Sequence, residues 1–130
     1  SKEPLGAATR DNDDDWNDVV AWVWYGMITA EEFGITSANY AAEATTAAAE
    51  GGDPGINRLL NQNLGLGTST NTLADTWMQA VLGAVGNYGE AYDRSFCDGD
   101  GGMNNCLIDR AGTANDLAAN GGLQYAPPMR

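Results

Sequence analysis

The stretch DNDDDWNDVVAWVWYGMITAEEF, residues 11–33, decides the fold class of this chain. Apolar side chains recur in it at helical spacing, and aromatic residues fill much of the remaining circumference. The carboxylates of Asp11 to Asp15 favour the positive end of a helix dipole, so they mark where the helix begins. Gly34 is the expected C′ residue that ends the helix. A helix that is apolar nearly all round is typical of a buried element, so we expect this one to be buried.

The rest of the chain predicts a mostly α fold with four to five helices and at most one short strand, in residues 5–10. Further helices are expected from the cap residue Ser37 to about Glu50, from Pro54, from Leu73 with a break near Gly86, and from Leu107 to about Asn120. Trp77, Val81, Val85, Tyr88 and Tyr92 predict one apolar stripe. Helices this apolar need a sheet or a thick bundle to pack against, and the chain supplies little else.

Composition excludes several classes of function. The chain has 130 residues, 18 acidic and 6 basic, and a net charge of −12. Such a surface repels phosphate backbones and anionic lipids, so neither nucleic acid nor membrane insertion is expected. The sequence has no histidine, which removes histidine-assisted nucleophiles and histidine-ligated zinc. No catalytic constellation emerges, so we expect no enzyme and no cofactor.

Two cysteines, Cys97 and Cys106, lie in the segment CDGDGGMNNC. A close pair in an acidic chain favours a disulfide over two free thiols. In the chain-entropy model a loop this short contributes about 2–3 kcal/mol of stability. The bridge predicts a periplasmic or extracellular location, because disulfides persist in oxidising compartments.

The same loop carries Asp98, Asp100, Asn104 and Asn105, which are oxygen ligands for a hard cation. Only two of them are charged, so we assign no metal and leave a cation at Asp98 and Asp100 as an open alternative.

Two other motifs resemble ligand sites only in part. Residues 11–18, DNDDDWND, place carboxylates at alternate positions, as in the first half of a calcium loop. The sixth and twelfth positions hold Trp16 and Trp22 instead of glycine and glutamate, so the helix-start interpretation is favoured. Residues 65–70, GLGTST, lack the lysine of a phosphate-binding loop and are interpreted as a linker.

Five segments together resemble a known family. They are SKEPLG (1–6), DDWNDVVAW (14–22), AEEFGITSAN (30–39), VGNYGEAYDR (85–94) and GGLQYAPPMR (121–130). In this order they resemble the substrate-binding proteins of general L-amino-acid ABC transporters, in the polar amino-acid uptake family. The resemblance covers nearly the whole chain and is weakest over residues 41–72 and 95–106.

This resemblance implies a two-lobe α/β periplasmic binding protein that closes on an amino acid and delivers it to an ABC permease. It places residues 1–10 at the hinge and return strand, and residues 11–130 in the helical C-terminal part of the first lobe. The chain is then a single incomplete domain. The main ligand-binding determinants are expected outside it, so no ligand-binding residue is assigned. The remainder of the binding protein, or a second copy of the chain, is an expected partner.

Two alternatives remain open at the level of sequence. The chain can be an extracellular helical module that self-assembles or needs a partner, because its tryptophans must be covered. It can also be an acidic module stabilised by calcium. In the C-terminal tail, Gly121 and Gly122 are expected to stop the last helix, and Tyr125 with Pro127 and Pro128 to form a stiff apolar strap.

Overall fold

The computed structural model describes residues 6–129, and within them the chain is helical. Its elements are α1 (Asp14–Glu32), α2 (Tyr40–Ala48), α3 (Pro54–Asn61), α4 (Trp77–Val85), α5 (Tyr88–Phe96) and the 3₁₀ turn η1 (Ala118–Asn120). In the described part, β-pairing is limited to two isolated β-bridges, Gly67 with Thr72 and Leu117 with Gln124. The prediction of a mostly α fold with four to five helices is confirmed. Residues 6–10 lie outside any strand, and residues 1–5 of the expected return strand fall outside the described part.

Helix α1 begins and ends where its local signals predict. The Asp13 carboxylate caps it by accepting the Trp16 N–H at 3.2 Å. At the other end Gly34 adopts a φ of +70°. The Gly34 N–H donates to the Glu31 carbonyl, and the Ile35 N–H donates to the Ala30 carbonyl at 2.8 Å. These two bonds form a Schellman motif, which places Ile35 in the core.

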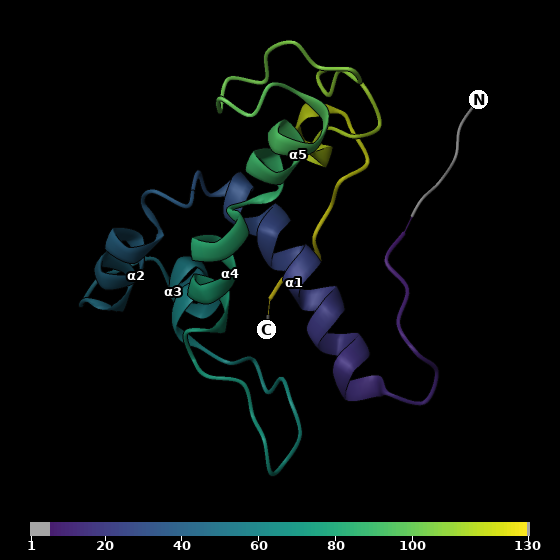
Figure 1. The fold of residues 1–130 in the computed structure, drawn as a ribbon. Coiled ribbons are helices and arrows are strands. Elements are labelled where there is room, and N and C mark those ends of the chain that lie inside the picture. The colour runs from purple at the N-terminus through teal and green to yellow at the C-terminus, as the bar shows by residue number, and fades with distance from the viewer. Residues whose placement is uncertain (1–5, 130) are drawn as a thin grey trace.

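The expectation that α1 is buried all round is wrong for this chain. Trp16 and Trp24 remain 55% and 47% exposed, and the buried residues of the helix are Gly26, Ile28 and Ala30. Figure 1 shows why: the shorter helices gather around the C-terminal part of α1, and its N-terminal part extends beyond them. Within the described residues this half of the helix is covered only in part, through Val19, Trp22 and Val23, which pack against the main core.

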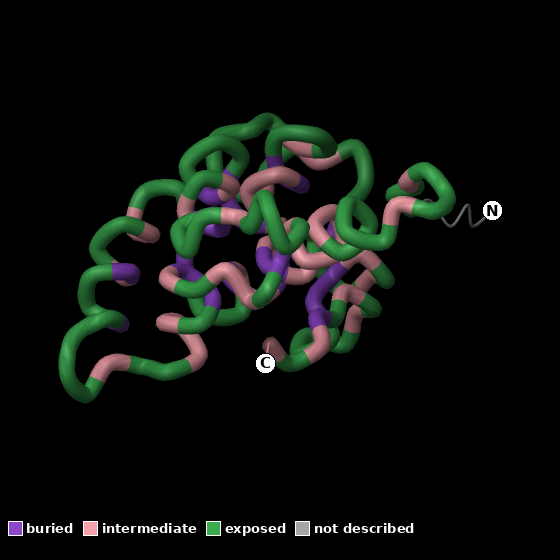
Figure 2. Tube along the Cα trace, turned by 90° about the horizontal axis from the view of Figure 1, so that it is seen from below, coloured by how far each residue is buried: buried purple, intermediate pink, exposed green. Residues whose placement is uncertain are grey.

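The core lies between α1, α2, α3 and α4, and buried positions concentrate there in Figure 2. Its buried residues are Ala30, Ile35, Ala44, Leu59, Leu60, Leu66, Trp77, Met78 and Leu82. A second, smaller cluster joins Ile28 to Leu117 and Ala126, so the C-terminal part of the chain packs on α1. Within the described residues, no helix is both long enough and apolar enough to cross a membrane.

Helix α2 begins at Tyr40 and not at Ser37 as predicted. The Ser37 hydroxyl donates to a carboxylate oxygen of Glu90 at 2.6 Å, and it accepts no backbone N–H of α2. Asn39 occupies the cap position, and its side chain accepts the Thr36 N–H at 2.7 Å. A contact with a residue 53 positions away therefore displaces the local signal.

The predicted break near Gly86 is present and separates α4 from α5. Gly86 has a φ of +74°, which a side chain rarely adopts. The break divides the predicted apolar stripe, so its continuity is wrong: Trp77 lies in the main core, whereas Val85 is exposed. The predicted start of α3 at Pro54 is confirmed, with Asp53 as its cap.

The helix expected from Leu107 to Asn120 is wrong except for the single turn η1. Leu107 is 91% exposed, and the segment after it folds into turns that direct Arg110 into the interior. Gly112 has a φ of +74°, and the Thr113 N–H donates to the Arg110 carbonyl at 3.1 Å. Contacts beyond the local sequence hold this segment, because Arg110 pairs with Glu31 of α1 and its Nε donates to the Asn115 carbonyl.

The C-terminal tail is docked in part. The Ala118 N–H donates to the Gln124 carbonyl at 2.8 Å, Ala126 is buried, and Met129 packs against the main core. Leu123 and Tyr125 are exposed. The tail is therefore a strap as predicted, but its contacts come from Ala126 and Met129 and not mainly from Tyr125.

Candidate functional site

Arg110, which is 8% exposed, is the centre of one cluster of buried and half-buried polar groups. Its guanidinium forms a forked ion pair with Glu31 on α1, in which Nη1 donates to Oε1 and Nη2 donates to Oε2 at 2.9 Å. Its Nε donates to the Asn115 carbonyl at 3.1 Å. The guanidinium also lies 4.7 Å from the centre of the Tyr88 ring on α5. Arg110 thus joins α1, α5 and the segment before η1.

The electrostatics of this cluster fit a structural role. Burial alone lowers the pKa of Arg110, but the hydrogen bonds and charge of Glu31 outweigh it and raise that pKa above its usual value. Burial raises the pKa of Tyr88, against the lowering effect of the Arg110 charge. All three nitrogens of Arg110 have acceptors within the chain. We therefore interpret Arg110 as a structural link and not as a receptor for a ligand carboxylate.

Gly89 of α5 is what lets this ion pair approach the helix. A Cβ atom at this position would lie 2.6 Å from Oε1 of Glu31 and 3.1 Å from Nη1 of Arg110. The first distance is shorter than real Cβ contacts and the second is tighter than most of them, so a larger residue would displace the carboxylate of Glu31.

A second polar network fixes the start of α5. Asn87 and Glu90 form a capping box, in which Asn87 accepts the Glu90 N–H at 2.9 Å and Glu90 accepts the Asn87 N–H at 2.7 Å. The network also reaches the turn after α1, because the Asn87 amide donates to the Ile35 carbonyl at 2.9 Å. Glu90 in addition accepts the Ser37 hydroxyl.

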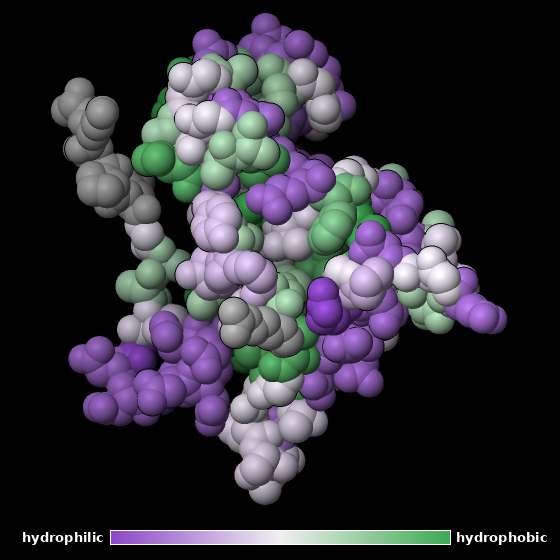
Figure 3. Space-filling view, turned by 180° about the vertical axis from the view of Figure 1, so that it is seen from behind, coloured by the Kyte–Doolittle hydropathy of each residue, from purple (hydrophilic) through white to green (hydrophobic). Residues whose placement is uncertain are grey.

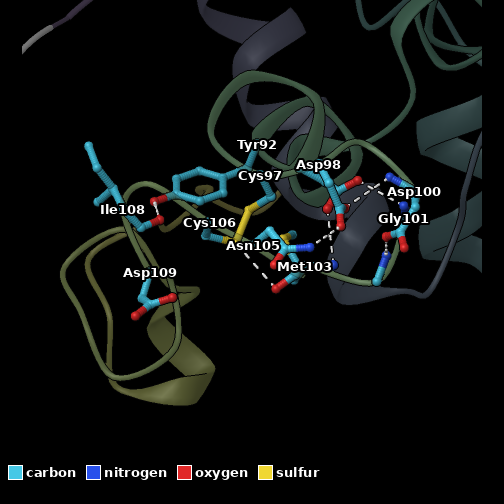
Figure 4. Close-up of a disulfide and its surroundings, with 12 residues drawn as sticks. Tyr92, Cys97, Asp98, Asp100, Gly101, Met103, Asn105, Cys106, Ile108 and Asp109 are labelled. Atoms are coloured by element: carbon cyan, nitrogen blue, oxygen red, sulfur yellow. Dashed lines mark hydrogen bonds between the residues drawn. A yellow bond between two sulfur atoms is a disulfide. The ribbon is translucent and has the colours of Figure 1, made fainter.

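The acidic loop between α5 and residue 107 is closed by the disulfide that the sequence predicts, between Cys97 and Cys106 (Figure 4). Carboxylate oxygens of Asp93, Asp98 and Asp100 lie within 4.8 Å of one another. Asp93 is buried and accepts the Gly101 and Met103 N–H groups, at 2.8 and 3.0 Å.

The carboxylates of this loop already have donors within the chain. Asp98 accepts the side-chain amide of Asn105 at 2.9 Å, which holds the pKa of Asp98 below its usual value. Asp100 accepts the Gly102 N–H at 2.7 Å. These bonds explain the fold of the loop without a metal, and a cation at Asp98 and Asp100 stays a prediction. The helix-start interpretation of Asp11–Asp15 is confirmed by the cap at Asp13.

Two open cavities lie at the surface. One, of about 370 Å³, is lined by Asp109, Arg110 and Asp116 together with Met103 and Cys106. The other, of about 360 Å³, lies under the tail. Phe33, Arg58, Tyr125 and Pro127 are among its lining residues. Both are open to solvent, and neither gathers a set of catalytic groups.

Large apolar side chains are also exposed at several places, and the space-filling view of Figure 3 shows hydrophobic areas between hydrophilic ones. These side chains are Trp16, Trp24, Phe33, Val85, Phe96, Leu107, Ile108, Leu123 and Tyr125. Exposed apolar area of this kind indicates a surface that another element covers.

Sequence reasoning missed Asp93, Arg110, Glu31 and Glu90 as organising residues. One of them had a readable signal: Asn87 followed by Glu90 three positions later is the spacing of a capping box. The ion pair of Glu31 with Arg110 has no such local signal, because the two residues are 79 positions apart.

Comparison of this chain with known proteins shows which class of protein it resembles. Over its whole length the chain is homologous to a segment of periplasmic binding proteins of amino-acid ABC transporters. The chain spans 35% of the length of the curated relatives it matches. The resemblance read from the sequence is therefore confirmed, although no family model matches the chain.

Particular relatives are similar over all of this chain. The general L-amino acid-binding periplasmic protein AapJ of Rhizobium johnstonii is 40% identical, and the glutamate/glutamine/aspartate/asparagine-binding protein BztA of Rhodobacter capsulatus is 38% identical. Among solved structures, a periplasmic binding protein from Brucella ovis with glutathione bound has a TM-score of 0.76 at 32% identity. It covers 100% of this chain, and the chain covers 37% of it.

Proposed function

We propose that this chain is a segment of a solute-binding protein that captures L-amino acids for import by an ABC transporter. The observation that carries the proposal is the similarity over 100% of the chain to proteins named for amino-acid binding. In this account the protein is periplasmic and non-catalytic, and its partners are an amino acid and an ABC permease.

Within that protein, residues 1–10 are the hinge segment, although residues 6–10 form no strand here, and residues 11–130 are the C-terminal helical part of the first lobe. The half-covered α1 supports this placement, because exposed Trp16 and Trp24 need neighbouring structure to pack against. The remainder of the binding protein supplies that structure. It also supplies the main groups that hold the amino acid, since the charged network around Arg110 is satisfied internally.

Thermal melting of the full-length protein with each L-amino acid tests this function. A ligand that binds only the folded state raises the free energy of unfolding by about 2.7 kcal/mol at 100 times its dissociation constant, and the melting temperature rises with it. We expect at least one polar L-amino acid to raise it, with the D-enantiomer as the matched control. The absence of a shift with every L-amino acid contradicts the proposal.

The exposed tryptophans also favour a second candidate, a helical module that self-assembles. In that case the 130-residue chain alone sediments as a concentration-dependent oligomer, and Trp16→Glu returns it to a monomer. A compact monomer at all concentrations excludes this candidate.

A further inference from the structure

Asp93, near the end of α5, is an acidic residue that is only 2% exposed. Among the described residues, no basic side chain forms an ion pair with it. A buried carboxylate is stable only when hydrogen bonds replace the water that it has lost. Asp93 obtains them from two backbone donors: the Gly101 N–H donates to Oδ2 at 2.8 Å, and the Met103 N–H donates to Oδ1 at 3.0 Å. Both donors belong to the loop that the disulfide between Cys97 and Cys106 closes.

The backbone of this loop adopts a conformation that needs support. Met103 and Asn105 have φ values of +55° and +53°, in the left-handed region that residues with a side chain rarely adopt. Two hydrogen bonds cross the loop at this point. The Asp98 N–H donates to the Asn104 carbonyl at 3.1 Å, and the Asp98 carboxylate accepts the Asn105 amide at 2.9 Å (Figure 4).

The two cysteines lie where the ends of the loop meet. Just outside the bridge, the Leu107 N–H donates to the Phe96 carbonyl at 2.7 Å. Inside the bridge, the loop turns back on α5 and directs its two N–H groups at Asp93. One loop conformation therefore satisfies the buried carboxylate and also brings the two sulfur atoms together.

Two features that depend on the same conformation stabilise each other, and the coupling is equal in both directions. The bridge restricts the loop to conformations in which Gly101 and Met103 reach Asp93. In return, the two hydrogen bonds to Asp93 favour the conformation in which the bridge forms. If local turns alone fixed the loop, neither feature would depend on the other.

We propose that Asp93 is a positioning residue for the disulfide and that residues 98–105 form a redox-sensitive element. The loop is ordered on Asp93 when the bridge is oxidised and is released from it when the bridge is reduced. In the reduction, dithiothreitol gives two electrons and two protons to the bond between Cys97 and Cys106. This bond becomes two thiols, and the reagent closes into its own cyclic disulfide. The inference concerns this loop alone and is independent of the proposed function.

The test measures the equilibrium of the full-length protein with mixtures of reduced and oxidised dithiothreitol. Free thiols are trapped with a maleimide and located at Cys97 and Cys106 by mass spectrometry. Asp93→Asn keeps the shape of the side chain but removes its charge and one acceptor. We therefore expect the equilibrium constant for disulfide formation to fall about tenfold.

The matched control is Asp109→Asn, at an exposed aspartate of the same segment. It removes the same charge but no hydrogen bond to the loop, so the equilibrium constant should stay within about twofold of the wild type. A loss of overall stability does not move this constant while both redox forms stay folded, which circular dichroism checks. The constant therefore separates positioning of the bridge from a general contribution to the fold.

Hydrogen exchange of the wild type gives a second measurement that needs no substitution. The Gly101 and Met103 N–H groups should be protected in the oxidised protein and exchange at least about tenfold faster after reduction. The proposal is overturned if Asp93→Asn has the same redox equilibrium as the wild type. It is also overturned if reduction leaves both N–H groups as protected as before, because local turns then hold the loop without the bridge.

Discussion

Glu31 and Arg110 form a buried, forked ion pair that joins α1 to the C-terminal segment across 79 positions of sequence. Arg110 is buried in this pair, whereas Leu107 and Ile108 before it are exposed, and the segment forms turns where a helix was expected. Removing one partner of a buried pair leaves the other charge without compensation. The pair therefore supports the first prediction about stability.

Arg110→Ala is expected to lower the free energy of unfolding by about 1–5 kcal/mol, between the ranges for exposed and buried pairs, because the Glu31 side chain is still 19% exposed. Urea unfolding of the chain, followed by tryptophan fluorescence, measures this change. The control is Arg10→Ala, at the exposed ion pair of Arg10 with Asp13, where the loss is at most about 1 kcal/mol. Equal losses for the two variants contradict the structural role of Arg110.

The second prediction concerns the capping network at Glu90. Glu90→Ala removes the acceptor of both the Ser37 hydroxyl and the Asn87 N–H, so we expect a loss of about 2 kcal/mol. Glu43→Ala, at an acidic residue of α2, is the control and is expected to change stability by less than about 0.5 kcal/mol. Thermal unfolding of the three proteins compares them. If Glu90→Ala and Glu43→Ala have the same melting temperature, the network contributes nothing to stability.

Reduction of the disulfide supplies the third prediction. The Cys97–Cys106 bond closes a short loop, so its loss is expected to cost about 2–3 kcal/mol. Unfolding with and without dithiothreitol measures the loss, and the Cys97→Ser/Cys106→Ser double variant must show no effect of the reductant. If the unfolding curve of the wild type is the same before and after full reduction by dithiothreitol, the disulfide does not stabilise the loop.

The fourth prediction is the acid response of Asp116. A hydrogen bond from the Asn120 side chain, together with one from the Leu117 N–H, holds the pKa of Asp116 below its usual value of 3.8, against the opposing effect of burial. Because the pKa is depressed in the folded state, the stability that it contributes is full above the unfolded value and is lost as the pH falls through the folded value.

Below about pH 4 the wild type should therefore lose stability faster than Asp116→Asn, and at pH 7 the variant should already lack the contribution. Unfolding curves from pH 7 to pH 2 measure the difference between the two proteins. Parallel curves over this range show that Asp116 contributes no acid sensitivity.

Local signals explain what the sequence could predict. Asp13 and Gly34 mark the ends of α1 by capping chemistry that depends on a few neighbouring residues, and Pro54 marks α3 in the same way. The disulfide follows from two cysteines nine positions apart. These features depend on short stretches, so they are readable without the fold.

Long-range contacts explain what the sequence could not predict. Leu107 and Ile108 read as the start of a helix, but their backbone bonds to α5, through the Phe96 carbonyl and the Tyr92 hydroxyl. The sequence predicts Ser37 as a helix cap, but its hydroxyl donates a hydrogen bond to Glu90, 53 positions away. The exposure of Trp16 has a different cause. The apolar periodicity of α1 predicts which helix face must pack against other structure, but it does not say whether that structure belongs to this chain.

Calorimetry with one polar L-amino acid, run on both the full-length protein and the 130-residue chain, tests the central claim most directly. We expect saturable one-site binding by the full-length protein and no tight binding by the chain alone, because we propose that the main ligand groups lie outside it. Absence of heat with the full-length protein, or micromolar affinity of the isolated chain, would contradict the account.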